Sequence, residues 1–246
     1  MYADRLAKII MESQRIVFFG GAGVSTASGI PDFRSADGIF HQPLNRTCSP
    51  EELVSHTFYK KYPAEFFQFY REKLVYPQAK PNPCHIALAQ LEKMGKLSAV
   101  ITQNIDGLHQ QAGSKNVIEL HGSIHRNYCE ECGSFYPLAY ILETKEIPRC
   151  TKCEGRVKPD VVLYEESLNT DSLEQAIYEL THGDTLIVGG TSLMVYPAAG
   201  LLQFFRGTKR VFINKNPSAV DQQADLLICD DIAAIFQSVM GKIRFS

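Results

Sequence analysis

The sequence predicts a doubly wound α/β domain, in which helices cover both faces of a parallel sheet. Two observations support this class. Short runs rich in Val, Ile and Leu recur along the chain, and helical patterns separate most of them. The expected strands are 15–20, 98–104, 116–122, 160–166, 184–190, 210–214 and 224–229. The expected helices are 3–13, 85–95, 171–183, 198–207 and 232–243.

Two segments depart from this alternation. Residues 35–76 contain aromatic helical pieces and no strand pattern, and residues 125–158 are dominated by paired cysteines. We expect them to form a smaller domain, a helical module (35–76) beside a cysteine ribbon (125–158). Segments 1–34, 77–124 and 159–246 would then form the large domain. A cleft between the two domains is the expected ligand site.

Composition excludes some functions. Of 246 residues, 45% are hydrophobic and 21% charged, and 25 Lys and Arg nearly balance 27 Asp and Glu. No strong field therefore attracts nucleic acid or membranes. No apolar run approaches the ~18 residues of a membrane helix. Residues 1–14 form an amphipathic helix with Asp4 and Glu12, unlike a signal peptide. We expect a cytoplasmic protein, with a monomer as the default.

Four of the seven cysteines form two Cys-x-x-Cys pairs, Cys129 with Cys132 and Cys150 with Cys153, separated by the 17 residues 133–149. This spacing is typical of a zinc ribbon, whose two knuckles supply four thiolates to one Zn²⁺. Two reducible disulfides or a redox pair are the alternative. Four thiolates leave no open position on the metal. We therefore expect a structural zinc and no zinc-hydrolase chemistry.

A glycine-rich turn follows the first strand. In "GAGVST", Gly21 and Gly23 permit a tight strand-to-helix turn whose N–H groups face a pyrophosphate. Thr26 stands where the common dehydrogenase fingerprint has a third glycine, and no strand ending in an acid follows ~20 residues later. Both departures disfavour hydride transfer. A tight connection without any ligand is the other interpretation of this turn.

Polar residues follow several other expected strands. They are Gly189 to Ser192, Asn214 to Asn216, Thr102 to Asp106, and His121 before Gly122. Ligands of open α/β sheets bind at the carboxyl ends of the strands. Taken singly, each stretch is also explained as an ordinary polar loop, the histidine as a structural residue, and Asn104 and Asp106 as helix caps.

Together these motifs resemble the sirtuin family, the NAD-dependent protein lysine deacylases. The matching stretches, in family order, are "GAGVSTASGIPDFR", "TQNIDGLH", "LHG", the two Cys-x-x-Cys pairs, "PDVVLYEE", "GTSLMVYPAA" and "INKNP". The resemblance covers nearly the whole chain. It implies a Rossmann-type large domain, a small domain with a zinc ribbon, NAD as co-substrate, and an acetylated protein lysine as the other substrate.

The resemblance also implies roles for single residues. Asn104 and His121 are catalytic, with His121 as the base. The acyl-lysine tunnel is flanked by Val162, Tyr164 and Val195. Residues expected to bind the cofactor are Gly21, Ala22, Gly23, Thr26, Asp32, Phe33, Arg34, Gln103, Asn104, Ile105, Asp106, His121, Gly190, Thr191, Ser192, Asn214, Lys215, Asp231 and Ile232.

The implied reaction consumes NAD at its bond to nicotinamide. The acyl oxygen displaces nicotinamide from the ribose, and His121 then takes a proton through the ribose hydroxyls. Free lysine and O-acyl-ADP-ribose result. Phe33 would cover the ribose face and exclude water, while Asp32 and Arg34 would order the loop around the cofactor.

This chain departs from the family pattern at Tyr164-Glu165-Glu166, where Phe-Gly-Glu is common. The resemblance implies that the substrate peptide pairs as a strand between "LYEES" and "LMVYP", so the Glu165 side chain would project near that strand. Family members that remove acidic acyl groups carry Tyr-x-x-Arg, whereas this chain has "FQFY", residues 67–70, followed one place late by Arg71. Burying an unpaired carboxylate is unfavourable, so we predict a deacetylase and not a desuccinylase.

Four alternatives stand beside this interpretation. Protein ADP-ribosyl transfer shares the first half of the reaction, and removal of other acyl groups shares all of it. A hydride-transferring NAD enzyme is the nearest rival from sequence chemistry alone. A zinc-ribbon module that binds nucleic acid is disfavoured by the balanced charge.

Overall fold

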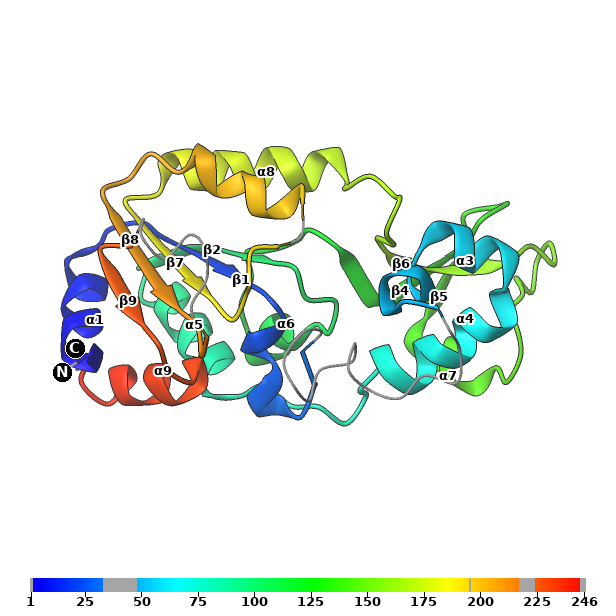
Figure 1. Ribbon diagram of the computed structural model, residues 1–246, viewed down its shortest axis with the longest axis horizontal. Helices are drawn as coiled ribbons and strands as arrows, with labels where there is room; N and C mark the ends of the chain where they lie inside the picture. Colours follow the sequence, from blue (N-terminus) through cyan, green and yellow to red (C-terminus); the bar gives the residue numbers. More distant parts are fainter. Residues whose placement is uncertain (1, 33–47, 195, 217–223, 244–246) are drawn as a thin grey trace.

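A six-stranded parallel sheet forms the larger part of the molecule (Figure 1). The computed structural model describes residues 2–32, 48–194, 196–216 and 224–243. The strand order is β3-β2-β1-β7-β8-β9. The bounds are β1 Ile16–Gly20, β2 Leu97–Thr102, β3 Val117–Glu119, β7 Thr185–Gly189, β8 Lys209–Ile213 and β9 Leu226–Ile228. Gly20 pairs with Thr102 on one side and Gly189 on the other, so these strands end level.

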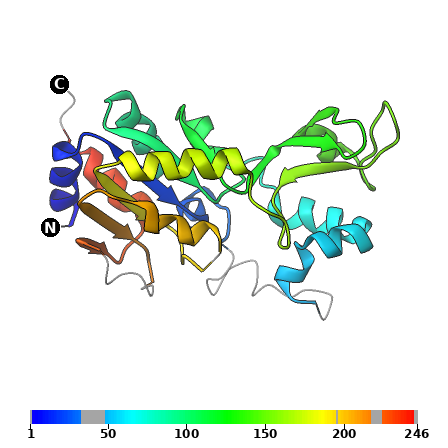
Figure 2. The same ribbon diagram turned by 90° about the horizontal axis from the view of Figure 1, so that it is seen from above.

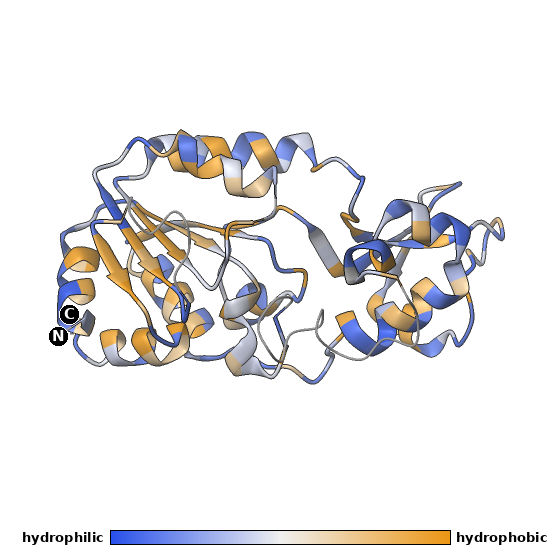
Figure 3. Ribbon diagram, viewed as in Figure 1, coloured by the Kyte–Doolittle hydropathy of each residue, from blue (hydrophilic) through white to orange (hydrophobic). Residues whose placement is uncertain are grey.

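Helices cover both faces of this sheet, as Figures 1 and 2 show. On one face lie α1 (Tyr2–Glu12), α5 (Pro83–Lys93) and α9 (Ile232–Met240), and on the other lie α8 (Thr170–His182) and the 3₁₀ helix η5 (Ala198–Phe204). Phe18 packs into the first core, while Val17 and Phe19 pack into the second. Every residue of β1 is therefore buried, which explains its uninterrupted apolar sequence (Figure 3). The predicted doubly wound fold is confirmed.

A three-stranded antiparallel sheet forms the core of the smaller part, in the order β5-β4-β6. Its strands are β4 Gly122–Cys129, β5 Phe135–Pro137 and β6 Val157–Val161. Around it lie the helices α2 Pro50–Leu53, α3 His56–Lys61, α4 Pro63–Phe69, a π-helical turn η4 Tyr70–Leu74, and α7 Leu138–Glu143. One hydrophobic cluster joins Phe66, Phe67 and Tyr70 of the helices to Cys129 and Val157 of the sheet. The helices and the cysteine ribbon therefore share one core.

Three predicted elements differ from the structure. Residues 160–166 were predicted as one more strand of the large sheet, but β6 ends at Val161 and belongs to the antiparallel sheet. The residues after β1 form two short 3₁₀ turns, η1 Ala22–Val24 and η2 Thr26–Ser28, because Gly29 follows with a φ of 83° and ends the helical path. The expected helix at 198–207 is the 3₁₀ helix η5. The residue boundaries of the two domains stay a prediction.

No helix in the described ranges has the length and hydropathy needed to cross a bilayer. The remaining helix, α6 (Leu108–Ala112), begins directly after the Asn104–Asp106 stretch. It packs against α5, and this contact fixes the loop that follows β2.

Candidate active site

The glycine turn lies where the strand order of the large sheet reverses, between β1 and β7. Gly21 N donates to the carbonyl of Gly189 at 3.3 Å, and Gly23 N donates to that of Gly190 at 2.8 Å. A Cβ on Gly23 would lie 2.8 Å from the Cα of Gly190. Gly190 itself has a φ of 61°, and a Cβ there would overlap the backbone of Val24. Neither position accepts a side chain, because the backbone of the turn packs directly on the end of β7 at the switch point, where open α/β sheets bind ligands.

The rest of the turn is held by local hydrogen bonds. Ala22 accepts from Ser25 N at 3.0 Å, and the Thr26 hydroxyl donates to the Gly23 carbonyl at 3.1 Å. Asp32 is half-buried at the end of the described stretch. Phe33 and Arg34, expected in the cofactor loop, lie outside the described residues.

The Asn104–Asp106 stretch forms a polar wall against the turn, joined to it by hydrogen bonds through Ser25. Ser25 Oγ donates to Asp106 Oδ2 at 2.6 Å, and Asn104 Nδ2 donates to Ser25 Oγ at 3.0 Å. Asp106 Oδ1 accepts from Leu108 N, the first amide of α6, at 2.9 Å. Burial raises the pKa of Asp106 above its ordinary 3.8, and the two donors oppose that rise. Ile105 accepts from Ile124 N at 3.0 Å, which joins this wall to β4.

Ser25 is a site residue that the sequence reasoning missed. It is fully buried and joins the glycine turn to both Asn104 and Asp106. The only sequence signal was a small hydroxyl residue inside the glycine motif. Its partners are 79 and 81 residues away along the chain, a distance that no local pattern spans.

His121 follows β3 and faces the end of β2. Its Nδ1 lies 3.0 Å from the carbonyl oxygen of Gln103. A carbonyl only accepts, so Nδ1 carries the proton and Nε2 presents a lone pair. Burial lowers the pKa of His121 below its ordinary 6.5, against the opposing effect of that hydrogen bond. The imidazole is therefore neutral at pH 7 and competent to act as a base.

Gly122 is required directly after the histidine. Its φ is 75°, and a Cβ there would overlap the carbonyl oxygen of Asp160 on β6. The close approach of β4 to β6 at this point brings Val162 N within 3.0 Å of the His121 carbonyl. The backbone of the histidine is thereby bonded to the segment expected to bind the acyl-lysine.

The expected adenosine side is built from the ends of β7 and β8. Gln103 Nε2 donates to Thr191 Oγ1 at 3.1 Å, and Thr191 N donates to Asn214 Oδ1 at 3.0 Å. Asn214 is buried, yet its Nδ2 has no hydrogen-bond partner among the described residues. Ser192 is exposed beside Thr191. An unpaired buried donor one strand from the switch point fits a ligand rich in acceptor oxygens, such as a dinucleotide.

Lys215, Asp231 and Ile232 also meet at this edge. Lys215 Nζ lies 2.9 Å from Asp231 Oδ2, while Asp231 Oδ1 caps α9 by accepting from Ala234 N at 3.0 Å. Ile232 is buried against Gly189 at the end of β7. Of the residues expected to line the acyl-lysine tunnel, Val162 is half-buried and Tyr164 is exposed. Val195 lies outside the described residues.

The four paired cysteines meet at the far end of the smaller sheet. Their Sγ atoms all lie within 4.8 Å of one another. A tetrahedral Zn²⁺ with Zn–S bonds of about 2.3 Å requires sulfur separations of about 3.8 Å, so the cluster fits one zinc. Tyr136 Oη donates to Cys150 Sγ at 3.1 Å and orients that ligand. The set is complete with four thiolates, which makes it a structural site.

The fold and the site together define the class of protein to which this chain belongs. A Rossmann-type sheet carries a glycine turn at its switch point and a neutral histidine after β3, and the smaller part holds four cysteines that fit one structural zinc. Known proteins are similar to this chain along nearly its whole length. Residues 21–197 match the Sir2 family, and the chain belongs to that family.

The relatives are named for one activity. The chain is 60% identical over 241 residues to the NAD-dependent protein deacetylase of Clostridium perfringens, covering 98% of this chain and 97% of that protein. Among solved structures, a Sir2 protein with deacetylated p53 peptide and 3′-O-acetyl-ADP-ribose has a TM-score of 0.90 at 38% identity, covering 98% of both chains. A Sir2–p53 peptide–NAD⁺ complex has a TM-score of 0.87 at 38% identity, again covering 98% of both.

Proposed function

We propose that this chain removes acetyl groups from protein lysines in an NAD-dependent reaction that yields nicotinamide, O-acetyl-ADP-ribose and free lysine. The observation that carries the proposal is His121, whose Nδ1 is held by the Gln103 carbonyl and whose backbone bonds to Val162. A base of fixed tautomer thus stands between the nucleotide side and the peptide side. The names of the similar proteins support the same activity.

Different residues of the chain bind the two halves of the dinucleotide and act as the base. Bound NAD supplies an activated ribose that accepts the acetyl group as nicotinamide leaves. The turn at Gly21–Gly23 would lie against the pyrophosphate, with the Gly21 and Gly23 amides holding the turn on Gly189 and Gly190, and Asn214 supplies a donor nearby that has no partner among the described residues. Asn104 and Asp106, joined through Ser25, form the wall against which the nicotinamide amide would hydrogen-bond. His121 Nε2 takes the proton that is passed through the ribose hydroxyls.

We assign the remaining expected site residues on the same basis. The pyrophosphate turn also uses Ala22 and Thr26, the adenosine half uses Gly190, Thr191, Ser192, Lys215, Asp231 and Ile232, and the acyl-lysine lies against Val162 and Tyr164. The helical module and the cysteine ribbon form the small domain, with boundaries at 35–76 and 125–158. Four reduced thiols at a zinc site favour a reducing compartment, so we place the protein in the cytoplasm.

The structure of the helical module supports acetyl over succinyl as the acyl group. Arg71, one place from the position of an acid-binding arginine, donates from Nε to the Ile141 carbonyl at 2.9 Å and from a terminal nitrogen to the Glu146 carbonyl. Its guanidinium also lies 5.5 Å from the centre of the Phe67 ring. It is committed to α7 and its following loop, and so it does not serve a bound carboxylate.

We therefore expect acetyl-lysine peptide to be deacylated at least about 10-fold more efficiently than succinyl-lysine peptide of the same sequence, since an unpaired buried carboxylate costs more than about 1.4 kcal/mol. The measurement is kcat/KM for the two peptides at saturating NAD. Faster turnover of the succinyl peptide would show that a cation does reach the acyl pocket.

The deacetylation itself is tested by incubating the protein with acetyl-lysine peptide, with and without NAD. The proposal predicts peptide deacetylation only with NAD, accompanied by free nicotinamide and no NADH absorbance. Formation of NADH would favour hydride transfer instead. ADP-ribose left on a protein, seen as a mass increase, would favour the ADP-ribosyltransferase alternative.

A further inference from the structure

The segment after β6, residues 162–166, is bonded at one end to the histidine and at the other to the helical module. Val162 N donates to the His121 carbonyl at 3.0 Å. Tyr164 N donates to the Val54 carbonyl, and Tyr164 accepts from His56 N, both at 3.0 Å. The conformation of this segment therefore depends on how firmly it is held against α3.

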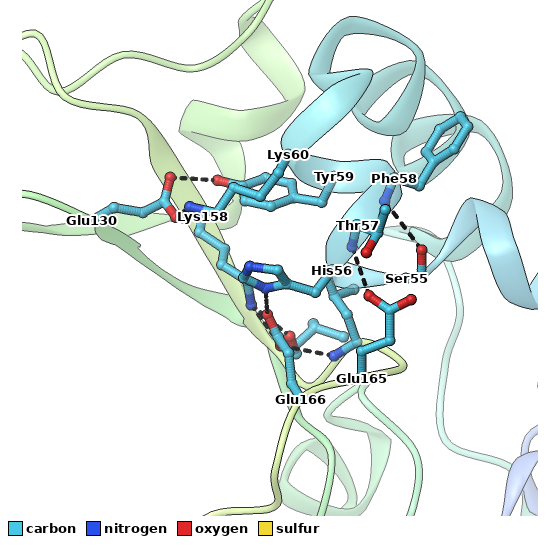
Figure 4. A network of polar contacts seen from close by, with 12 residues as sticks. Ser55, His56, Thr57, Phe58, Tyr59, Lys60, Glu130, Lys158, Glu165 and Glu166 are labelled. Carbon is cyan, nitrogen blue, oxygen red and sulfur yellow. Dashed lines mark hydrogen bonds and ion pairs between the residues drawn. The ribbon is translucent and has the colours of Figure 1, made fainter.

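Glu165 occupies a backbone conformation that side chains rarely adopt. Its φ is 74°, in the left-handed region that favours glycine. Its side chain points to α3, where a carboxylate oxygen accepts from Thr57 N at 2.8 Å (Figure 4). This bond lowers the pKa of Glu165 below its ordinary 4.5. The unfavourable backbone conformation is retained together with a specific contact between two elements 108 residues apart.

Glu166 makes a second set of contacts from the same segment. One oxygen lies 2.8 Å from His56 Nδ1, and the other lies 3.1 Å from Lys158 Nζ and accepts from Leu163 N at 2.9 Å. Glu166 thus binds α3, β6 and its own turn at once (Figure 4). The hydrogen bonds from His56 and Leu163 hold its pKa below 4.5 against the effect of burial.

The same helix is also held from the zinc ribbon. Tyr59 Oη donates to Glu130 Oε2 at 2.8 Å, and Lys60 Nζ lies 2.6 Å from Glu130 Oε1. Glu130 lies inside the first Cys-x-x-Cys pair. The helix α3 therefore connects the metal ribbon to residues 162–166, and the two glutamates make the final link of this chain of contacts.

We propose that Glu165 and Glu166 form a clasp that positions Tyr164 for the acyl-lysine peptide. Both act as positioning residues, because their carboxylates contact α3 and β6, whereas Tyr164 is the exposed large side chain of the segment. The inference rests on the proposed deacetylase function. It predicts that loosening the clasp weakens peptide binding and leaves the NAD site unchanged.

Three substitutions of Glu165 separate the clasp from a backbone effect. Both Glu165→Ala and Glu165→Gly remove the carboxylate. Alanine leaves a side chain at the unfavourable φ, whereas glycine adopts that φ without strain. Glu165→Gln retains an oxygen that accepts from Thr57 N. The matched control is Glu154, a second glutamate with positive φ (60°), which lies in the zinc loop. Glu154→Ala and Glu154→Gly carry the same backbone changes without touching the clasp.

In steady-state assays we expect both Glu165→Ala and Glu165→Gly to raise the peptide KM roughly 3- to 10-fold, the size of one lost charge-assisted hydrogen bond at an exposed site. The KM for NAD and kcat stay near wild type. Glu165→Gln stays within about 2-fold for the peptide KM, and so do both Glu154 variants. A Glu165→Gly protein with wild-type peptide KM would overturn the proposal.

Hydrogen exchange at the Thr57 amide tests the clasp without any turnover. The proposal predicts faster exchange at Thr57 in Glu165→Ala and Glu165→Gly, restored protection in Glu165→Gln, and equal zinc content in all of them. Unchanged exchange in the alanine variant contradicts the clasp whatever the activity. A wild-type protein without NAD-dependent deacetylation would instead contradict the proposed function.

Discussion

Replacing His121 by alanine is expected to lower kcat/KM for NAD-dependent deacetylation by roughly 10²–10⁴-fold, the usual contribution of a positioned general base. The Gln103 carbonyl fixes the proton on Nδ1, so Nε2 is the basic atom that the substitution removes from the reaction. The protein should remain folded, because the imidazole supplies only one hydrogen bond to the described residues. Circular dichroism and zinc content check that point.

The pH dependence provides a second readout of the same residue. Burial holds the pKa of His121 below 6.5, so the imidazole is neutral through pH 7 and becomes protonated only at lower pH. As a base it is active in the neutral form. We therefore expect kcat/KM to be constant between pH 7 and 8 and to fall on acidification, with a midpoint below 6.5. The residual activity of the alanine variant should not show this fall on acidification.

His182 is the matched control for this substitution. It lies exposed at the end of α8, where its ring centre is 4.2 Å from that of Tyr178 and its Nδ1 is 2.8 Å from the Tyr178 carbonyl oxygen. His182→Ala should retain the wild-type kcat/KM and the same fall of kcat/KM on acidification. If His121→Ala retained more than about a tenth of the wild-type rate, the assigned base would be wrong.

Removal of one zinc ligand should have the second large effect. We expect Cys150→Ser to lose the metal and most of the activity, since a structural zinc contributes about 10–16 kcal/mol in small zinc domains. Cys150 is buried in the core that also holds Phe66 and Tyr70, so losing the ribbon also disturbs the helices. Metal analysis, near-ultraviolet circular dichroism and deacetylase assays measure the three consequences.

The control for the zinc prediction is Cys229→Ser. Cys229 is an exposed thiol at the end of β9, outside the four-cysteine cluster. This variant should retain one zinc per chain and wild-type turnover. A Cys150→Ser protein with bound zinc and unchanged near-ultraviolet spectrum would refute the four-thiolate assignment.

The large sheet was predictable because burial on both faces makes its strands continuous apolar runs. All five residues of β1 are buried, and its sequence "IVFFG" shows this directly. The segment 160–166 has a similar run. Its first two residues nevertheless end β6 of the antiparallel sheet, and residues 162–166 bond to His121 and to the helical module. An apolar run indicates burial and cannot indicate which sheet buries it.

The site was predictable to the extent that its residues lie at strand ends. Parallel strands end at one edge, so Gly21, Thr191 and Asn214 were expected to meet, and the structure brings them together. The contacts of Ser25 with Asp106 and of Glu165 with Thr57 were not foreseen. They join side chains far apart along the chain, and only the packing of the elements determines such pairs.

The central claim is that NAD is consumed as the acceptor of the acetyl group, and the mass of the acetyl-bearing product tests it most directly. With NAD and an acetyl-lysine peptide, we expect acetylated ADP-ribose, free nicotinamide and deacetylated peptide in a ratio of one to one to one. Release of the acetyl group as free acetate from the outset, with NAD left intact, would contradict the account.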